Sequence, residues 1–481
     1  MLTQTDINQF TYTHLPVWVT ATCDFTRFDD LNTSAGEDVF LNKSSGGIAL
    51  FTTVRVAYSR PNFPINDNVI RNLFERNNGR RRTLGEVMQA TKNTLSSVYK
   101  LGFCLIGDPA VKMAYPEFGM KVTTVNGQSV DGNSISFKAL EKITVEGEVL
   151  DASGQLVTDF TGIVNPTVKD SKVTVTCLKN SNKDDSPAFT FTDYPNTIFI
   201  GNDSVRNGKF SFTFTVPKDI SYSNLQGKMN LYAVDTESGN EAQGNFDNFI
   251  VGGTSDTAET DTIGPEIRAL YLNDTTFVDG GQVNTTPYFV AELWDKSGVN
   301  ITGSSVGHDM MLVIDESTVL SYNLNSYYEL LLGEDGTGIV KFPIPALEPG
   351  KHTAEFWVWD ILNNSTVRTF TFEVVEGLKP FLFDVIATPG IAREQVTFHL
   401  MHNRPESRMR VGIMVYDLAG RQLWKHEESG TSGLFENYTV SWDLTSGGAR
   451  MRPGVYIYRA AISTDNSKDA TKARKFIILG E

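Results

Sequence analysis

The stretch Leu15-Pro-Val-Trp-Val-Thr-Ala-Thr-Cys-Asp-Phe25 decides the fold of the first part of the chain, because a short apolar run ends there in small and polar residues. Two further apolar runs follow, Gly47-Ile-Ala-Leu-Phe-Thr-Thr-Val54 and Gly102-Phe-Cys-Leu-Ile106, with a helical pattern between them at 83–99. Apolar runs that alternate with helical patterns are typical of a mainly parallel sheet covered by helices. We therefore expect an α/β fold over residues 1–118.

The helical pattern has a recognisable start. Thr83 suits the N-cap position, and Glu86 follows three residues later, which is the spacing of a capping box. Apolar side chains then recur near the spacing of an amphipathic helix, at Leu84, Val87, Met88, Thr91, Leu95 and Val98. The sequence predicts a helix over 83–99 that covers one face of the sheet.

After Lys121 the sequence changes to short segments of alternating apolar and polar residues, such as Gly208-Lys-Phe-Ser-Phe-Thr-Phe-Thr-Val216. Such alternation, interrupted by turn residues, is typical of β-sandwich strands. The polar stretch 252–263 interrupts the pattern and predicts a linker. The sequence thus predicts β-sandwich domains at 119–251, 264–376 and 377–481, the last two of them Ig-like.

Composition excludes several classes of function. The 481 residues carry 57 Asp and Glu against 42 Lys and Arg, and this acidic excess lies after Phe118. A negative field repels phosphate backbones, so we expect no nucleic-acid partner. No uninterrupted apolar run reaches the roughly 18 residues of a membrane span. Cys23, Cys104 and Cys177 lack zinc-ligand spacing and do not form a disulfide framework, and we expect neither a metal nor a cofactor.

Cys23 is the strongest candidate for chemistry. It comes directly after the strand predicted over 15–21, where α/β folds present functional groups in the crevice outside the strand ends. A thiol at this place can act as a nucleophile. The alternative is that Cys23 is a small buried apolar side chain, which is the common role of a free cysteine.

Five ordered motifs resemble the gingipain family of cysteine peptidases. They are Thr20-Ala-Thr-Cys-Asp-Phe-Thr-Arg-Phe-Asp-Asp30, Ser34-Ala-Gly-Glu37, Gly46-Gly-Ile-Ala-Leu-Phe-Thr-Thr-Val-Arg55, Thr83-Leu-Gly-Glu86 and Leu105-Ile-Gly-Asp-Pro-Ala110. The resemblance implies the C-terminal part of an α/β, caspase-like peptidase domain over 1–118, followed by all-β Ig-like sandwich domains. It also implies that Cys23 is the catalytic nucleophile.

The resemblance implies a partner histidine upstream of the thiol, in a Gly-His-Gly type motif. His14 is the only histidine before Cys23, and a strand of about seven residues at about 3.3 Å each would hold it roughly 20 Å away. We therefore expect His14 to be a solvated residue at the strand entrance. We expect the family histidine and a signal peptide to lie upstream of Met1, and this chain alone to be inactive.

Other polar residues are weaker candidates. His308 is expected at a turn or strand edge, and His399 and His402 lack a third metal ligand nearby. The triplet Arg80-Arg-Arg82 is expected in a solvated loop. The acidic residues between Asp24 and Glu37 could steer a basic substrate or hold a calcium ion, although no EF-hand spacing is present.

The β-rich remainder resembles a narrower group, the type IX secretion sortases, at Asp151–Phe160, Val205–Ile220, Val306–Asp309 and Val358–Ser365. The last block, 377–481, is similar to the C-terminal sorting domains of that system in Bacteroidetes. The resemblance implies a cysteine endopeptidase and transpeptidase on the outer membrane or cell surface of a Gram-negative bacterium. Its partners would be cargo proteins with sorting domains, outer-membrane secretion components, and a lipopolysaccharide amine as acyl acceptor.

Two alternatives stay open. A chain that is mostly β-sandwich could be an inert surface adhesin, scaffold or pseudoenzyme. A secreted gingipain-like protease would share the thiol and the fold but hydrolyse other proteins.

Overall fold

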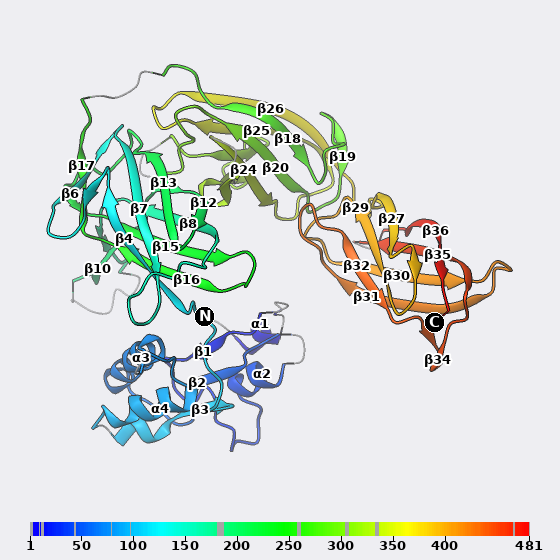
Figure 1. Ribbon diagram of the computed structural model, residues 1–481, viewed down its shortest axis with the longest axis horizontal. Helices are drawn as coiled ribbons and strands as arrows, with labels where there is room; N and C mark the ends of the chain where they lie inside the picture. The colour runs from blue at the N-terminus through cyan, green and yellow to red at the C-terminus, as the bar shows by residue number, and fades with distance from the viewer. Residues whose placement is uncertain are drawn as a thin grey trace. The chain divides into compact units, whose positions relative to one another are not determined.

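The computed structural model describes residues 3–8, 10, 14–42, 45–77, 79–96, 98–179, 187–256, 261–303, 307–331, 336–464 and 467–480. The chain divides into two compact units (Figure 1). The first contains residues 1–119 and 150–155, and the second contains residues 120–149 and 156–481. Among the described residues, no helix has the length and apolar character needed to cross a membrane.

The first unit is an α/β layer structure. Its described elements are α1 (Gln4–Asn8), β1 (Val17–Val19), α2 (Ala35–Leu41), β2 (Ala49–Thr53), α3 (Ser59–Phe74), α4 (Leu84–Asn93), the 3-10 helix η1 (Val98–Gly102) and β3 (Phe103–Gly107). The sheet order is β1-β2-β3. β1 runs parallel to β2, whereas β3 runs antiparallel to it, so the sheet is mixed rather than mainly parallel. Apolar periodicity does not encode strand direction.

The central strand β2 is buried along its whole length because helices cover both of its faces. Ala49 and Phe51 belong to a core that includes side chains from α3 and α4. Leu50 points the other way and joins Val39 of α2 in a second core. This alternation is the period of two expected of a strand, and it explains why β2 reads as one continuous apolar run.

The predicted helix after Thr83 is present but shorter than expected. Thr83 caps α4 in a complete capping box with Glu86, as the sequence indicated. The helix ends at Asn93, where the Thr94 hydroxyl donates a 2.9 Å hydrogen bond back to the Thr91 carbonyl. Such local bonds from a threonine side chain compete with helix continuation.

The second unit begins with a sheet that closes on itself. Its strand order runs β8-β12-β13-β7-β4-β16-β15, and β15 pairs again with β8 over eight residue pairs. The sheet comprises β4 (Phe118–Val125), β5 (Gln128–Ser129), β7 (Lys142–Leu150), β8 (Gly162–Lys169), β11 (Thr197–Ile200), β12 (Asp203–Arg206), β13 (Lys209–Thr215), β15 (Lys228–Asp235) and β16 (Glu241–Phe246). Strand alternation alone did not predict this closure.

Two small sheets accompany the closed sheet. They are formed by β6 (Ile135–Ala139), β14 (Leu225–Gln226) and β17 (Phe249–Thr254), and by β9 (Val173–Thr176) and β10 (Thr190–Asp193). Within the three-stranded sheet, the Phe137 and Phe249 rings stack with centroids 4.3 Å apart. Phe137 also contacts Phe214 of the closed sheet edge to face, with centroids 5.9 Å apart.

The middle of the second unit has two facing sheets. One contains β18 (Glu266–Leu272), β20 (Tyr288–Trp294), β23 (Tyr328–Leu330) and β24 (Thr337–Pro343), with the 3-10 helix η2 (Asn325–Tyr327) beside it. The other contains β19 (Gly281–Val283), β21 (Met311–Ile314), β22 (Ser321–Asn323), β25 (Gly350–Trp359) and β26 (Ser365–Val374). Buried side chains from both sheets, among them Phe289 and Phe356, form one core.

The last block repeats this arrangement. One sheet contains β27 (Leu382–Thr388), β29 (Val396–His402) and β32 (Tyr438–Trp442), and a two-stranded sheet contains β33 (Thr445–Ser446) and β34 (Ala449–Arg450). The remaining sheet contains β28 (Ile391–Ala392), β30 (Met409–Tyr416), β31 (Gln422–Gly430), β35 (Gly454–Ser463) and β36 (Ala470–Ile478). Phe398 and Tyr458 meet in its core with ring centroids 4.8 Å apart.

Candidate active site

Cys23 lies in a loop that leaves β1 and stays bonded to the end of β2. The Thr20 N–H donates to the Phe51 carbonyl at 2.9 Å, and the Thr26 N–H donates to the Thr53 carbonyl at 3.1 Å. Asp24 between them has a left-handed backbone with φ 49°, which turns the chain just after the cysteine. The loop therefore presents Cys23 at the sheet edge where the sequence placed it.

Threonine side chains of β2 form hydrogen bonds with this loop. The Thr52 hydroxyl lies 2.9 Å from both the Thr20 and the Thr26 hydroxyls, and these atoms are buried. The Thr53 hydroxyl donates a 2.5 Å hydrogen bond to the Thr22 carbonyl, directly before the cysteine. The network positions the backbone on both sides of Cys23.

Helix α2 fixes the far side of the loop. The Gly36 N–H donates to the Phe25 carbonyl at 2.8 Å. A Cβ atom at position 36 would lie 1.8 Å from Thr26 Oγ1 and 2.6 Å from Thr26 Cβ. Only glycine permits this approach, so the start of α2 and the Cys23 loop form one packed element.

The Cys23 thiol is exposed and donates a 2.8 Å hydrogen bond to the Ala57 carbonyl. The alternative of a buried apolar cysteine does not fit this exposure. Within the described part of the chain, the thiol has no second hydrogen-bond partner, and a carbonyl cannot take up its proton. The described residues of the first unit thus position a nucleophile, and none of them receives a hydrogen bond from the thiol through a basic side chain.

The acidic residues after Cys23 are largely engaged. Arg55 donates to both Asp29 carboxylate oxygens, at 3.1 and 2.6 Å, and these bonds lower the pKa of Asp29. Glu37 completes the capping box of α2, and hydrogen bonds from Ser34 lower the pKa of Glu37. These two carboxylates serve local structure, and the expectation of calcium between Asp24 and Glu37 stays a prediction.

The arginine triplet forms ion pairs within the first unit. Arg80 pairs with Glu86 at 2.5 Å and Arg82 pairs with Glu75 at 2.9 Å. Arg81 pairs with Glu117 at 2.5 Å. The triplet is therefore a set of internal ion pairs rather than a free basic loop.

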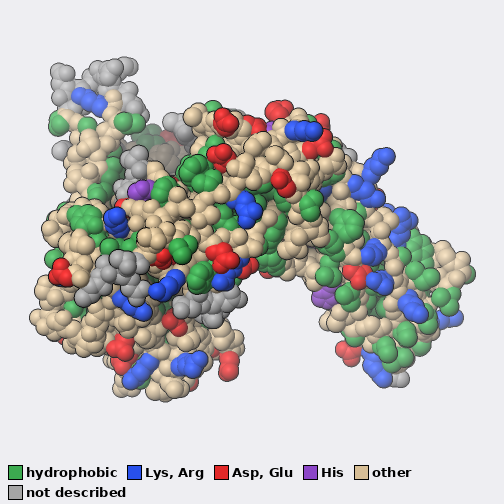
Figure 2. Space-filling model, turned by 90° about the horizontal axis from the view of Figure 1, so that it is seen from above, with side chains coloured by type: hydrophobic (Ala, Val, Ile, Leu, Met, Phe, Trp, Pro, Cys, Tyr) green, Lys and Arg blue, Asp and Glu red, His purple; other side chains and the backbone are tan. Residues whose placement is uncertain are grey.

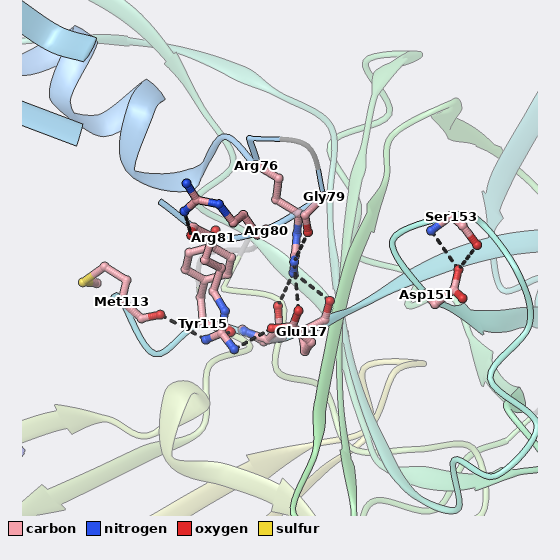
Figure 3. Close-up of polar contacts among 10 residues, drawn as sticks. Arg76, Gly79, Arg80, Arg81, Met113, Tyr115, Glu117, Asp151 and Ser153 are labelled. Carbon is pink, nitrogen blue, oxygen red and sulfur yellow. Dashed lines mark hydrogen bonds and ion pairs between the residues drawn. The ribbon is translucent and has the colours of Figure 1, made fainter. Parts of the chain in front are cut away.

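Glu117 is the centre of a further cluster, in which two guanidinium groups converge on one carboxylate (Figure 3). Arg76 contacts Glu117 at 3.2 Å, and Arg76 and Arg81 lie 5.6 and 5.3 Å from the centre of the Tyr115 ring. Burial alone would raise the pKa of Glu117, but the hydrogen bonds from Arg76 and Arg81 outweigh it and lower that pKa. The cluster therefore connects Glu117 to the segment between α3 and α4.

Histidines of the second unit have structural partners. His308 Nδ1 lies 2.6 Å from an Asp219 carboxylate oxygen, and its ring packs on Trp359 with centroids 4.5 Å apart. His402 Nε2 lies 2.8 Å from the Ser432 hydroxyl, while its Nδ1 accepts the Arg404 N–H. The expectation of a turn or strand-edge position was made for His308, and that residue lies just before β21.

One group among the described residues has the ligand types for a metal ion. Carboxylate oxygens of Asp261, Asp295 and Asp360 lie within 4.8 Å of one another, and the last two residues are buried. Burial and repulsion from Asp360 and Asp261 raise the pKa of Asp295 to about 6. Sequence reasoning missed this group because its members are separated by 34 and 65 positions.

Comparisons with known proteins show that the first unit is similar to a peptidase family. Residues 1–114 match the model of Peptidase family C25. A search of curated proteins found no match. Among solved structures, dimeric latent PorU from Porphyromonas gingivalis is 37% identical, with 85% of this chain and 39% of that chain covered and a TM-score of 0.37. The chain thus spans well under half of the PorU chain.

The complex of Porphyromonas gingivalis RgpB pro- and mature domains is 18% identical, with 52% of this chain and 49% of that chain covered and a TM-score of 0.21. The expected α/β peptidase region followed by β-sheet domains is confirmed. Residues 1–114 are therefore similar to peptidase family C25, the gingipain family of cysteine peptidases.

Proposed function

We propose that this protein is a cell-surface cysteine endopeptidase and transpeptidase of the type IX secretion system. It would remove sorting domains from exported cargo and join the cargo to an amine of lipopolysaccharide. The observation that carries the proposal is the exposed Cys23 thiol, held at the end of β1 by Thr20, Thr52 and Thr53. The 37% identity to PorU supports the sortase reading over a general protease.

The chemistry requires two acyl transfers. The Cys23 thiolate attacks the scissile carbonyl, a carbon–sulfur bond forms, and the carbon–nitrogen bond breaks as the leaving amine takes a proton. An acceptor amine then attacks the thioester, the carbon–sulfur bond breaks and an amide forms. The proton that the amine nitrogen loses passes to the departing thiolate, which restores the thiol. Atoms and electrons balance without any oxidant or metal in this sequence of steps.

A base must take up the thiol proton in the first step. The Ala57 carbonyl, which accepts the Cys23 hydrogen bond at 2.8 Å, orients the thiol but cannot act as that base. We therefore assign the base to a histidine that the described part of this chain does not place next to Cys23.

The proposal includes partners and location. Cargo proteins with sorting domains are the substrates, outer-membrane secretion components are the partners, and the protein acts at the surface of a Gram-negative bacterium. The resemblance of residues 377–481 to sorting domains supports this location, since such a domain is itself an address for the system.

The test uses the protein purified as cells produce it, incubated with a cargo protein that carries a sorting domain and with a small primary amine. Mass spectrometry of the new carboxyl end separates an amide from a free acid. We expect mainly the amide, its loss in Cys23→Ala, and no change in Cys177→Ala, since Cys177 is also an exposed thiol.

The other readings predict different products. Free acid alone, formed at the same rate with or without amine, would favour a secreted hydrolytic protease. Intact cargo with the wild-type protein would favour an inert scaffold or pseudoenzyme. Product that persists in Cys23→Ala would refute the assignment of the nucleophile.

A further inference from the structure

Three aspartate carboxylates converge at one end of the sandwich in the middle of the second unit. Asp295 directly follows β20 of its four-stranded sheet, and Asp360 directly follows β25 of its five-stranded sheet. Asp261 belongs to the segment that leads into β18. One carboxylate oxygen of each residue lies within 4.8 Å of the other two. Both sheets and the segment before them thus contribute a carboxylate to one place.

Local hydrogen bonds orient the two buried carboxylates. Asp295 Oδ1 accepts the N–H groups of Ser297 and Gly298 at 2.8 and 2.9 Å. Asp360 Oδ1 accepts the Asn364 N–H at 2.7 Å, and Asn364 Nδ2 donates to Asp360 Oδ2 at 2.7 Å. Outer contacts of this kind hold ligand oxygens in place around a metal ion.

Asp295 gives an independent indication of a ligand. The residue is only 4% exposed, and its Oδ2 has no hydrogen-bond partner among the described residues. A buried carboxylate oxygen without a partner is strongly unfavourable. Asp295 also lines a partly open cavity of about 280 Å³, so an ion and its water ligands can reach this side chain.

No basic side chain neutralises the three charges. Among the described residues, no Lys, Arg or His forms an ion pair with Asp261, Asp295 or Asp360. The sequence adds no Lys, Arg or His in the stretches 257–260 and 332–335. Three like charges this close repel one another, so the group requires either protons or a cation.

The surrounding sandwich is the most acidic part of the chain. Residues 261–376 carry 17 Asp and Glu against 5 Lys and Arg, whereas the whole chain carries 57 against 42. Figure 2, which looks down on this sandwich, shows Asp and Glu side chains spread over the middle of the view. The field of this part of the protein attracts cations.

We propose that Asp261, Asp295 and Asp360 bind a calcium ion. Calcium takes oxygen ligands at about 2.3–2.6 Å, so ligands on opposite sides of the ion lie about 4.6–5.2 Å apart, and the 4.8 Å limit fits this span. Magnesium would require every pair within about 4.2 Å. Waters in the cavity complete the coordination, and the ion joins both sheets to the segment before β18. This site does not depend on the proposed peptidase function.

The first experiment titrates the purified, chelator-treated chain with calcium chloride by calorimetry. We expect one saturable site with a Kd of about 0.01–1 mM. Binding should weaken about tenfold or more in Asp295→Asn and in Asp360→Asn, because each variant removes a charged ligand. Glu316→Gln removes an equal charge from an exposed position of the same sandwich and should change the affinity less than about twofold.

The second experiment locates the ion in the wild-type protein, without any variant. Hydrogen exchange is compared in calcium and in chelator. Peptides over 261–265, 295–300 and 360–364 should gain about tenfold protection in calcium, because their N–H groups bond to the three carboxylates. Magnesium at the same concentration should protect them less.

Thermal unfolding separates a calcium site from carboxylates that share protons. In chelator, Asp295→Asn should unfold at no lower temperature than the wild type, because it removes one of three like charges. In calcium the order should reverse, because only the wild type gains from the ion. Absence of saturable calcium binding, unchanged binding in both Asp→Asn variants, or protection confined to 24–37 would overturn the proposal. Equal or tighter binding of magnesium would overturn the assignment to calcium.

Discussion

Gly36→Ala tests whether α2 holds the Cys23 loop in place. In the interior of an ordinary helix, this change stabilises the folded protein by about 0.5–1 kcal/mol, because glycine loses more backbone freedom on folding than alanine. At position 36 the new methyl group would lie 1.8 Å from Thr26 Oγ1, 2.6 Å from Thr26 Cβ and 2.9 Å from Thr26 Cγ2. Rotation of the side chain cannot relieve the contact with Cβ, so the backbone of the loop must move.

The expected magnitude follows from three terms. Overpacking of this kind costs about 1–3 kcal/mol. Movement of Thr26 also breaks its 2.9 Å contact with the Thr52 hydroxyl, for a further loss of about 1 kcal/mol. Against these stands the helical gain of about 0.5–1 kcal/mol. We expect a net local destabilisation of about 1–3 kcal/mol.

Hydrogen exchange read by mass spectrometry measures the effect locally, which suits a chain with two units. Peptides that cover 20–26 and 49–55 should lose protection by about tenfold in Gly36→Ala, which corresponds to about 1.4 kcal/mol. Alkylation of Cys23 should accelerate, because its bond to Ala57 loosens, while alkylation of Cys177 in the same molecule should not change.

Gly119→Ala is the matched control, since the nearest atom to its new methyl group would be the Leu150 carbonyl oxygen at 3.8 Å. Unchanged or increased protection of 20–26 in Gly36→Ala would refute the reasoning that α2 and the loop are one packed element.

Two further predictions concern charge. Glu117→Gln should lower the protection of peptides over 76–82 and 113–118 by about 1–2 kcal/mol, because it removes two ion pairs and releases both arginines from one carboxylate. The control Asp67→Asn breaks an exposed pair with Arg71 and should cost less than about 0.5 kcal/mol. Burial, and then the charge of Arg404, lower the pKa of His402 to about 4 from 6.5, so the folded state binds its proton more weakly than the unfolded state. The neutral ring stabilises the last block above pH 6.5, and about 1–2 kcal/mol should be lost as the pH falls from 6.5 towards 4. Urea unfolding followed by tryptophan fluorescence should show this loss of stability in the wild type and in the control His426→Gln. The stability of His402→Gln should depend less on pH. Equal pH profiles for the two variants would contradict the assignment of the loss to His402.

Local sequence signals predicted the features that depend on neighbouring residues. The capping box at Thr83 and Glu86 and the place of Cys23 after β1 both follow from short-range patterns. The end of α4 at Asn93 was missed, because the apolar spacing continues at Leu95 while a Thr94 side-chain bond stops the helix.

Features that join distant segments could not be predicted from the sequence. The closure of the sheet that begins the second unit depends on pairing of β8 with β15, and nothing in either strand specifies that partner. In the sequence, Gly36 looks like any glycine near a helix start, so its close contact with Thr26 could not be predicted.

The most direct test of the account is to trap the acyl-enzyme. The protein as cells produce it is mixed with cargo that carries a sorting domain, quenched in acid without an amine, and digested for mass spectrometry. The account predicts an acyl group on the peptide that contains Cys23, which disappears when a primary amine is added before the quench. An acyl group on Cys104 or Cys177, or cleavage of cargo at an unchanged rate in Cys23→Ala, would contradict it.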